Sequence, residues 1–275
     1  MSPKIPVILV TGFLGSGKTT FLCRIAAAHP ELRLLFLVNE FGGTNIDGPL
    51  LGETGRPTHS VVGGSLFCEC TAPDFARTME EDVLAEHGRR PLDAVVIETS
   101  GIADPEAIGR VMKTFGLDLV FQVQRIISVI TPRSFLKLVG NLSNIAAQIR
   151  TSDLVLVNKT DLVTETMIRD AEEAVEGINP GVEIMRCQYG DVPFSFAPRQ
   201  RALPEADLST ADANPYSTCT VPVSRRVSKP ALEAWLSALP TSVLRVKGVV
   251  RTHQGWFRVE KTLDGSALMP GSAVE

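Results

Sequence analysis

A glycine-rich segment near the N-terminus carries the clearest chemical signal in the sequence. Residues 12–19, Gly-Phe-Leu-Gly-Ser-Gly-Lys-Thr, match the phosphate-loop pattern G-x-x-x-x-G-K-[ST] at every fixed position. Glycines let the backbone wrap around phosphates with its N–H groups turned inward, and the positive end of the following helix points at the same phosphates. Lys18 would contact the β- and γ-phosphates, and the Thr19 hydroxyl would ligate Mg²⁺. The alternative is a glycine-rich turn with an unrelated lysine. The full match to the pattern, and its position between an apolar strand and a helix, disfavour this alternative. The expected nucleotide-binding residues of the loop are Gly12, Gly15, Ser16, Gly17, Lys18, Thr19 and Thr20.

A second motif selects the base. Asn158, Lys159, Thr160 and Asp161 follow an apolar run at residues 154–157, and N-K-x-D is a pattern with which many phosphate-loop proteins bind guanine. The Asp161 carboxylate would accept hydrogen bonds from the ring N1–H and the exocyclic amine, a pairing that adenine lacks. Asn158 would orient the loop, and the aliphatic stem of Lys159 would cover one face of the base. Taken alone, the tetrapeptide could be an ordinary polar turn. Because it lies downstream of a full phosphate loop, it predicts GTP and GDP as ligands.

A third polar segment follows the apolar run at residues 94–97. Glu98 could hold Mg²⁺ through water or orient the attacking water, and Gly101 lets the backbone approach the γ-phosphate. We therefore predict that Glu98 and Gly101 are catalytic together with Lys18. The alternative is that Glu98 caps the next helix, but Asp104 is better placed for that because a proline follows it.

The segment Asn39-Glu40-Phe41-Gly42-Gly43 closes another predicted strand. Glu40 could reach the metal or a switching contact, and the paired glycines are typical of a loop that moves. A mobile surface turn is equally compatible with these residues, so the metal role of Glu40 stays an open hypothesis.

Short apolar runs alternate with helical patterns as far as about residue 186. The runs are continuous and rich in β-branched residues, which favours strands covered on both faces and therefore a mostly parallel sheet. Residues 1–193 are thus predicted to form an α/β phosphate-loop GTPase domain with a doubly wound sheet. The predicted strands lie at residues 7–10, 34–38, 94–97 and 154–157, and the predicted helices at residues 20–28, 75–86, 145–150 and 166–176.

The composition changes after this domain. Residues 194–216 hold Pro198, Pro204 and Pro215 among Ser, Asp and Ala, which predicts a linker. Residues 217–275 predict a small, shortened α+β domain that begins with a strand. The further elements expected there are a helix at residues 231–239 and strands at 243–251 and 256–261, with no element at 267–275.

Composition excludes several classes of partner. The 275 residues carry a net charge of -4, from 27 Lys+Arg against 31 Asp+Glu, so no basic field exists to hold nucleic acid or an anionic membrane. No transmembrane span or secretory signal is visible, and the five scattered cysteines are unlike a disulfide framework. We expect a cytoplasmic protein.

In this order, the motifs resemble those of the CobW-like GTPases of the CobW/HypB/UreG family. The resemblance runs through most of the chain and implies a doubly wound GTPase domain with the family's small C-terminal domain. It also implies a GTP-driven metallochaperone, or an assistant to cobalamin-dependent proteins, whose partner is a client metalloprotein or corrinoid protein. It leaves a homodimer open. The matching residues are 12–20, 39–42 with 45–47, 98–105, 158–161, 232–236 and 245–248.

The cysteine motif departs from the family pattern. Members usually have G-C-x-C-C, a thiolate-rich metal site, where this chain has Gly64-Ser65-Leu66-Phe67-Cys68-Glu69-Cys70. Only Cys68 keeps its place, and Cys70 is an added thiol. On an extended segment the two thiolates would share one face, and Zn²⁺ or another transition metal would need further ligands, which Glu40 or Cys187 could supply. Small buried cysteines without a metal are the alternative.

The sequence therefore predicts a Mg²⁺-dependent GTP hydrolase that couples GTP binding and hydrolysis to delivery of a metal or cofactor to a client protein. Two alternatives remain. One is a GTPase that guards or reactivates a corrinoid-dependent enzyme and moves no metal. The other is a GTP-binding regulatory scaffold with negligible turnover.

Overall fold

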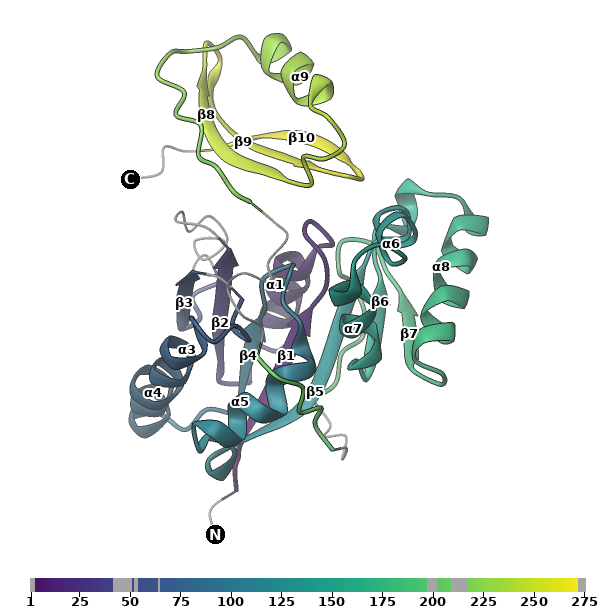
Figure 1. Ribbon diagram of the computed structural model, residues 1–275. Helices are drawn as coiled ribbons and strands as arrows, with labels where there is room; N and C mark the ends of the chain where they lie inside the picture. The colour runs from purple at the N-terminus through teal and green to yellow at the C-terminus, as the bar shows by residue number, and fades with distance from the viewer. Residues whose placement is uncertain are drawn as a thin grey trace. The chain divides into compact units, whose positions relative to one another are not determined.

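The computed structural model describes residues 3–41, 51, 54–63, 65–196, 202–208 and 217–271 (Figure 1). The chain divides into two compact units, Met1–Pro215 and Tyr216–Glu275. No helix among the described residues is long and apolar enough to cross a bilayer.

A parallel sheet forms the centre of the first unit. Within the described residues it has seven strands in the order β3-β2-β4-β1-β5-β6-β7, and each neighbouring pair is parallel. Because β1 lies between β4 and β5, its carboxyl end is a switch point of the winding, where open α/β sheets bind their ligands. The strands are β1 (Ile5–Thr11), β2 (Leu34–Phe41), β3 (Thr58–Gly63), β4 (Ala94–Glu98), β5 (Phe121–Ile130), β6 (Leu154–Val157) and β7 (Glu183–Arg186).

Helices cover both faces of this sheet, as the continuous apolar runs predict. Val7 and Leu9 of β1 join one hydrophobic cluster with α3 and α5, whereas Ile8 and Val10 join another with α1. The alternation follows from the two-residue period of a strand, and burial on both sides explains why no polar residue interrupts the run. The predicted doubly wound α/β fold is confirmed. The helices are α1 (Lys18–Ala28), α3 (Ala72–Thr78), α4 (Leu84–Arg89), α5 (Ile108–Thr114), α6 (Pro132–Leu138), α7 (Ser143–Arg150) and α8 (Glu165–Ile178), with helical turns η1 (Met79–Val83), η2 (Pro105–Ala107), η3 (Leu117–Leu119) and η4 (Thr160–Leu162).

The chain that follows β7 packs on α1. The ring of Phe194 meets that of Phe21 edge to face at 5.7 Å between centroids, and the Arg125 guanidinium lies 5.6 Å from the Phe194 centroid. Phe196 contacts the ring of His29 in the same way at 5.2 Å. This part of the expected linker therefore contributes to the apolar surface over α1.

Residues 202–208, here called the strap, lie along η2 and α5. The Gly109 N–H donates to the Pro204 carbonyl at 2.9 Å, and the Ala206 N–H donates to the Glu106 carbonyl at 2.9 Å. Leu203 of the strap packs against the cluster beneath α5. Like residues 194–196, the strap is part of the first unit's packing.

The second unit is a small antiparallel sheet covered by one helix. Within the described residues the strand order is β10-β9-β8. Leu232 and Leu236 of the helix pack on Val259 of the central strand, which gives this unit a core of its own. The Ser228 side chain caps the helix by accepting the Ala231 N–H at 3.3 Å. The elements are α9 (Lys229–Ala238), β8 (Val246–Thr252), β9 (Gly255–Thr262) and β10 (Gly265–Pro270).

Two predictions for this unit are wrong. Residues 267–270, expected to hold no element, belong to β10, where Leu268 is the register partner of Val259. A tight turn in which the Thr262 hydroxyl accepts the Asp264 N–H starts this strand, whose apolar run is too short to give a periodic signal. The strand expected before α9 is also missing from the described residues, where a single bridge joins Val227 to Thr252.

Candidate nucleotide-binding site

The glycine-rich loop connects β1 to α1 at the carboxyl edge of the sheet. Gly12, Gly15 and Gly17 all have positive φ, of 131°, 74° and 104°. Gly17 is the cap of α1, and a β-carbon there would lie 2.3 Å from the Asn158 side-chain nitrogen. Only glycine fits this position, because the backbone is left-handed and a side chain from a distant loop occupies the space.

Lys18 is held across this loop. Its side chain is buried, and its Nζ donates to the carbonyls of Gly12 at 2.9 Å and Phe13 at 3.3 Å. Four hydroxyls in or next to the loop, those of Thr11, Ser16, Thr99 and Ser100, are buried without a hydrogen-bond partner in the described part of the chain. Buried hydroxyls without partners are rare in proteins, so their gathering here fits a site that completes its hydrogen bonds with a ligand.

Thr19 and Glu98 meet where the sequence predicts the magnesium ion. Glu98 ends β4 beside Val10 of β1, and it is only 5% exposed. The Thr19 hydroxyl lies 3.1 and 3.0 Å from the two oxygens of the Glu98 carboxylate. A hydroxyl and a carboxylate are the hard oxygen donors that Mg²⁺ takes in proteins, so this pair fits the ion.

The loop after Glu98 is pressed against the phosphate loop. A β-carbon at Gly101 would lie 2.6 Å from the backbone nitrogen of Leu14, so only glycine allows this approach. Asp104 caps η2, because its carboxylate accepts the Glu106 N–H at 3.0 Å. Burial raises the pKa of Asp104, and this hydrogen bond opposes the rise. Helix capping therefore falls to Asp104, while Glu98 faces Thr19.

Two buried amides hold this loop in place. Asn39 of β2 accepts the Ser100 N–H at 3.1 Å. Gln148 of α7, 1% exposed, donates to the carbonyls of Gly101 at 3.4 Å and Ala103 at 3.0 Å. Sequence reasoning missed Gln148, since a lone glutamine in a helical pattern gives no signal of a contact 47 residues away. The Glu40 side chain and residues 42–50 lie outside the described residues.

Asn158 joins the two predicted nucleotide motifs. Its Nδ2 donates to the Ser16 carbonyl at 2.8 Å, and its Oδ1 accepts the Gly190 N–H at 3.1 Å. The phosphate loop, the loop after β6 and the loop after β7 thereby meet at one buried amide. The next residue, Lys159, has a left-handed φ of 57°, which turns the chain toward Asp161.

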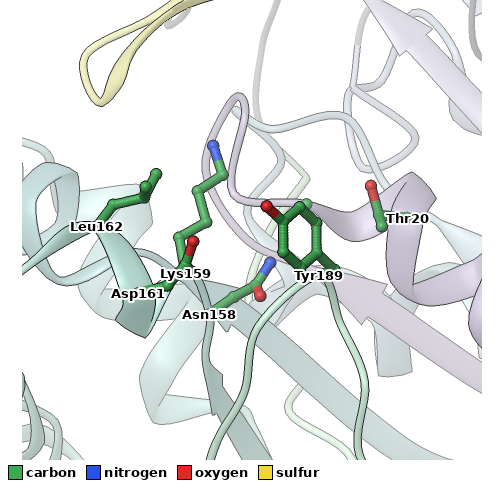
Figure 2. A pocket seen from close by; sticks show the side chains of 7 residues that line it. Thr20, Asn158, Lys159, Asp161, Leu162 and Tyr189 are labelled. Atoms are coloured by element: carbon green, nitrogen blue, oxygen red, sulfur yellow. The ribbon is translucent and has the colours of Figure 1, made fainter.

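A cavity of about 130 Å³ opens above these residues. In Figure 2, Lys159 and Tyr189 extend in the same direction from two loops, with the Asn158 amide between their bases. Tyr189 was missed by sequence reasoning because β7, which places it here, was not predicted. The side chains at the cavity are those of Thr20, Asn158, Lys159, Asp161, Leu162 and Tyr189.

The two candidate metal-binding cysteines lie in a turn before α3, not on an extended segment as expected. The Thr71 and Ala72 N–H groups both donate to the Cys68 carbonyl. Cys68 is buried and Cys70 exposed, yet the Cys70 N–H donates to the Cys68 sulfur at 3.4 Å. The pKa of the Cys70 thiol is raised, mainly by hydrogen bonding to the Cys68 thiol and to a smaller extent by burial. The two sulfurs thus remain neighbours in spite of the turn.

Cys187 was expected as a possible third ligand, and that expectation is wrong. Its thiol donates to the Asn158 side-chain oxygen at 3.4 Å and packs in the cluster over α1, because β7 lies at the opposite edge of the sheet from β3. The described residues contain no group of three or more His, Cys, Asp or Glu side chains that could hold a metal.

Comparison with known proteins gives consistent matches. The family described as the CobW/HypB/UreG nucleotide-binding domain matches residues 6–186. The zinc chaperone YeiR of Escherichia coli is 30% identical over 290 residues, which cover 93% of this chain and 86% of that protein. The zinc-regulated GTPase metalloprotein activator 1 of Saccharomyces cerevisiae is 28% identical over 215 residues, covering 70% of this chain. The chain spans about half the length of that protein and of its counterparts in Dictyostelium discoideum and Schizosaccharomyces pombe, at 50%, 47% and 46%.

Solved structures agree on the fold. The Zn(II)-bound YjiA GTPase of Escherichia coli aligns with a TM-score of 0.50 at 19% identity, over 98% of this chain and 90% of that one. HypB from Helicobacter pylori in complex with nickel aligns with a TM-score of 0.51 at 19% identity, over 68% of this chain and 80% of that one.

Proposed function

This chain belongs to the CobW/HypB/UreG family, and from that premise we propose that it is a Mg²⁺-dependent GTP hydrolase that couples its nucleotide state to metal delivery. Zinc is the proposed cargo, a client metalloprotein the proposed partner, and the cytoplasm the proposed location. Relatives described as zinc chaperones or a metalloprotein activator support the delivery role.

One observation carries the nucleotide part of the proposal. The Asn158 side chain donates to the phosphate loop at Ser16 and accepts from Gly190, although 142 residues separate it from Ser16. A fold has no general need for such a bridge between these loops. A nucleotide-binding site needs such a bridge, because it must hold one ligand at the phosphates and at the base together.

The proposed hydrolysis uses groups already placed around the loop. Lys18 would exchange its carbonyl acceptors, those of Gly12 and Phe13, for oxygens of the β- and γ-phosphates. Thr19 and Glu98 would hold Mg²⁺, which supplies charge neutralisation at the phosphates when bound. Glu98 could instead orient the attacking water. Gly101 keeps its backbone close to the phosphate loop, so the loop after Glu98 can respond to the γ-phosphate.

The proposed link to the metal runs through the sheet. Cys68 and Cys70 follow β3, which pairs with β2, and Asn39 of β2 accepts the Ser100 N–H of the loop after Glu98. A change in that loop could therefore reach the cysteine turn through one strand pair. Zinc would bind the two thiolates together with ligands from elsewhere, including the client.

GTP turnover by the purified chain tests the nucleotide assignment. We expect Mg²⁺-dependent turnover of GTP but not of ATP, and its loss in Lys18→Ala. Lys137→Ala, which removes an exposed lysine from α6, is the matched control and should hydrolyse GTP at the wild-type rate. Wild-type turnover in Lys18→Ala would refute the assignment.

The delivery role is tested by stimulation of the same reaction. Turnover that rises with Zn²⁺ and a zinc-requiring client would support it. Turnover that rises only with a corrinoid protein would replace delivery with guarding of a corrinoid enzyme, and GTP binding without turnover under any condition would indicate a scaffold.

A further inference from the structure

Tyr189 stands on a turn that is anchored on both sides. Before it, the Cys187 N–H donates to the Val157 carbonyl at 2.8 Å, and the Cys187 carbonyl accepts from the Thr160 N–H at 3.3 Å and hydroxyl at 3.1 Å. After it, the Gly190 N–H donates to Asn158 at 3.1 Å. The turn is thus fastened to the loop that carries the base motif.

Gly190 also fixes the turn against α1. A β-carbon at Gly190 would lie 2.8 Å from the α-carbon of Phe21, so the backbone there sits directly on the helix. Between these anchors Tyr189 adopts a left-handed φ of 53°. That conformation is unfavourable by about 1–2 kcal/mol for residues other than glycine, with Asn and Asp the best tolerated.

The Tyr189 side chain lies outside the hydrophobic core. The residue is 64% exposed, and its ring lines the cavity that Lys159 and Asp161 also line (Figure 2). A large aromatic side chain on a rigid turn at a backbone position unsuited to it needs an explanation other than stability. A flat ligand entering this cavity would meet the ring on one side and the Lys159 stem on the other.

We propose that the Tyr189 ring stacks on the nucleotide base and so forms the second wall of the base site. This rests on the proposed function, since it takes the base of GTP as the occupant. Every base has a π face, so stacking adds affinity without selecting guanine, and Asp161 supplies the selection through the base edge.

Two substitutions separate the ring from the backbone. Tyr189→Asn removes the ring but keeps a residue that tolerates left-handed φ, and Tyr189→Phe keeps the ring. Calorimetry should show that Tyr189→Asn binds GDP on the order of 10- to 100-fold more weakly, and that Tyr189→Phe binds it within about threefold of wild type. Inosine diphosphate, which lacks the 2-amino group, should bind Tyr189→Asn more weakly than wild type by the same factor as GDP does. Inorganic triphosphate, which has no base, should bind both variants as it binds wild type.

The outcomes are separable. Unchanged GDP affinity in Tyr189→Asn would overturn the stacking role while leaving the proposed function standing. An equal loss for inorganic triphosphate would also overturn it, because the substitution would then disturb the turn and through Asn158 the phosphate loop. A wild-type chain that binds neither GDP nor GTP would overturn the proposed function itself.

Discussion

Two helical glycines should respond to the same substitution with opposite signs. Alanine is favoured over glycine in a helix by roughly 0.5–1 kcal/mol, chiefly because glycine loses more backbone entropy on folding. Gly177, in the last turn of α8, has nothing within 4 Å of the position a β-carbon would take. Gly177→Ala should therefore raise the free energy of unfolding by about 0.5 kcal/mol.

Gly109 in α5 lies beneath the strap. A β-carbon there would lie 2.5 Å from the Pro204 carbonyl oxygen, 2.9 Å from Glu205 and 3.1 Å from Leu203. The first of these atoms is backbone, so the strap must move away. It would lose the Gly109 and Ala206 hydrogen bonds, at about 1 kcal/mol each. The exposed ion pairs of the strap, Arg110–Asp207 and Lys113–Glu205, contribute little. Set against the gain of about 0.5–1 kcal/mol, Gly109→Ala should destabilise the first unit by about 1 kcal/mol.

Urea unfolding of both variants measures the difference. Both tryptophans, Trp235 and Trp256, lie in the second unit, so far-UV circular dichroism must follow the first unit. Tryptophan fluorescence then serves as an internal control that should match wild type in both variants. A glutamyl endopeptidase should cut after Glu205 faster in Gly109→Ala. If that variant is as stable as Gly177→Ala and is cut at the wild-type rate, the strap does not rest on α5 as described.

Three further predictions concern the base, the metal and the pH response. Asp161→Asn should shift binding from guanine toward xanthine nucleotides, whose 2-oxo group suits an amide donor, and competition titrations in which GDP still wins would contradict this. In a zinc titration against a chromophoric chelator, Cys68→Ser/Cys70→Ser should bind zinc more weakly than wild type, and the zinc affinity of wild type should differ between GDP and a GTP analogue. A zinc affinity that is the same in all of these cases would remove zinc from the mechanism. Burial raises the pKa of the Cys187 thiol from 9.0 to about 11. Between these two pH values the native state keeps a proton that the unfolded chain loses. The contribution of this thiol to the free energy of unfolding is therefore fully present below pH 9 and is lost as the pH rises to 11. Cys187→Ala should therefore flatten the fall in unfolding free energy over that interval, and equal slopes for the two proteins would refute the assignment.

The parts of the fold and site that could be predicted are those written in contiguous residues. Residues 12–19 carry a complete pattern because one loop wraps the phosphates, and residues 158–161 follow a strand that is continuously apolar. Buried parallel strands such as β1 produce runs that stand out from their surroundings. β5 was not predicted, because the polar residues Gln122 and Arg125 interrupt the apolar run in its first half.

Other features depend on contacts that no local pattern encodes. Gln148 reaches the loop after Glu98 from a different helix, and Tyr189 enters the cavity only because β7 pairs with β6. The strap has the composition of a linker, since Pro204 and its neighbours gain their contacts from α5 rather than from a periodic pattern. The distance between Cys187 and the Cys68 turn depends on the order of the strands, which no local pattern encodes.

A single helix supports most of the site. α1 begins at the phosphate loop, the Gly190 turn sits directly on Phe21, and Phe194 and Phe196 pack along the same helix as far as His29. Segments that share one support tend to open together in native-state hydrogen exchange, as one cooperative unit rather than as independent loops. A nucleotide held at the phosphate loop should stabilise all the segments that pack on α1 together, by mass action. Amide protons in residues 191–196, which make none of the proposed contacts with the nucleotide, should therefore exchange more slowly when it binds.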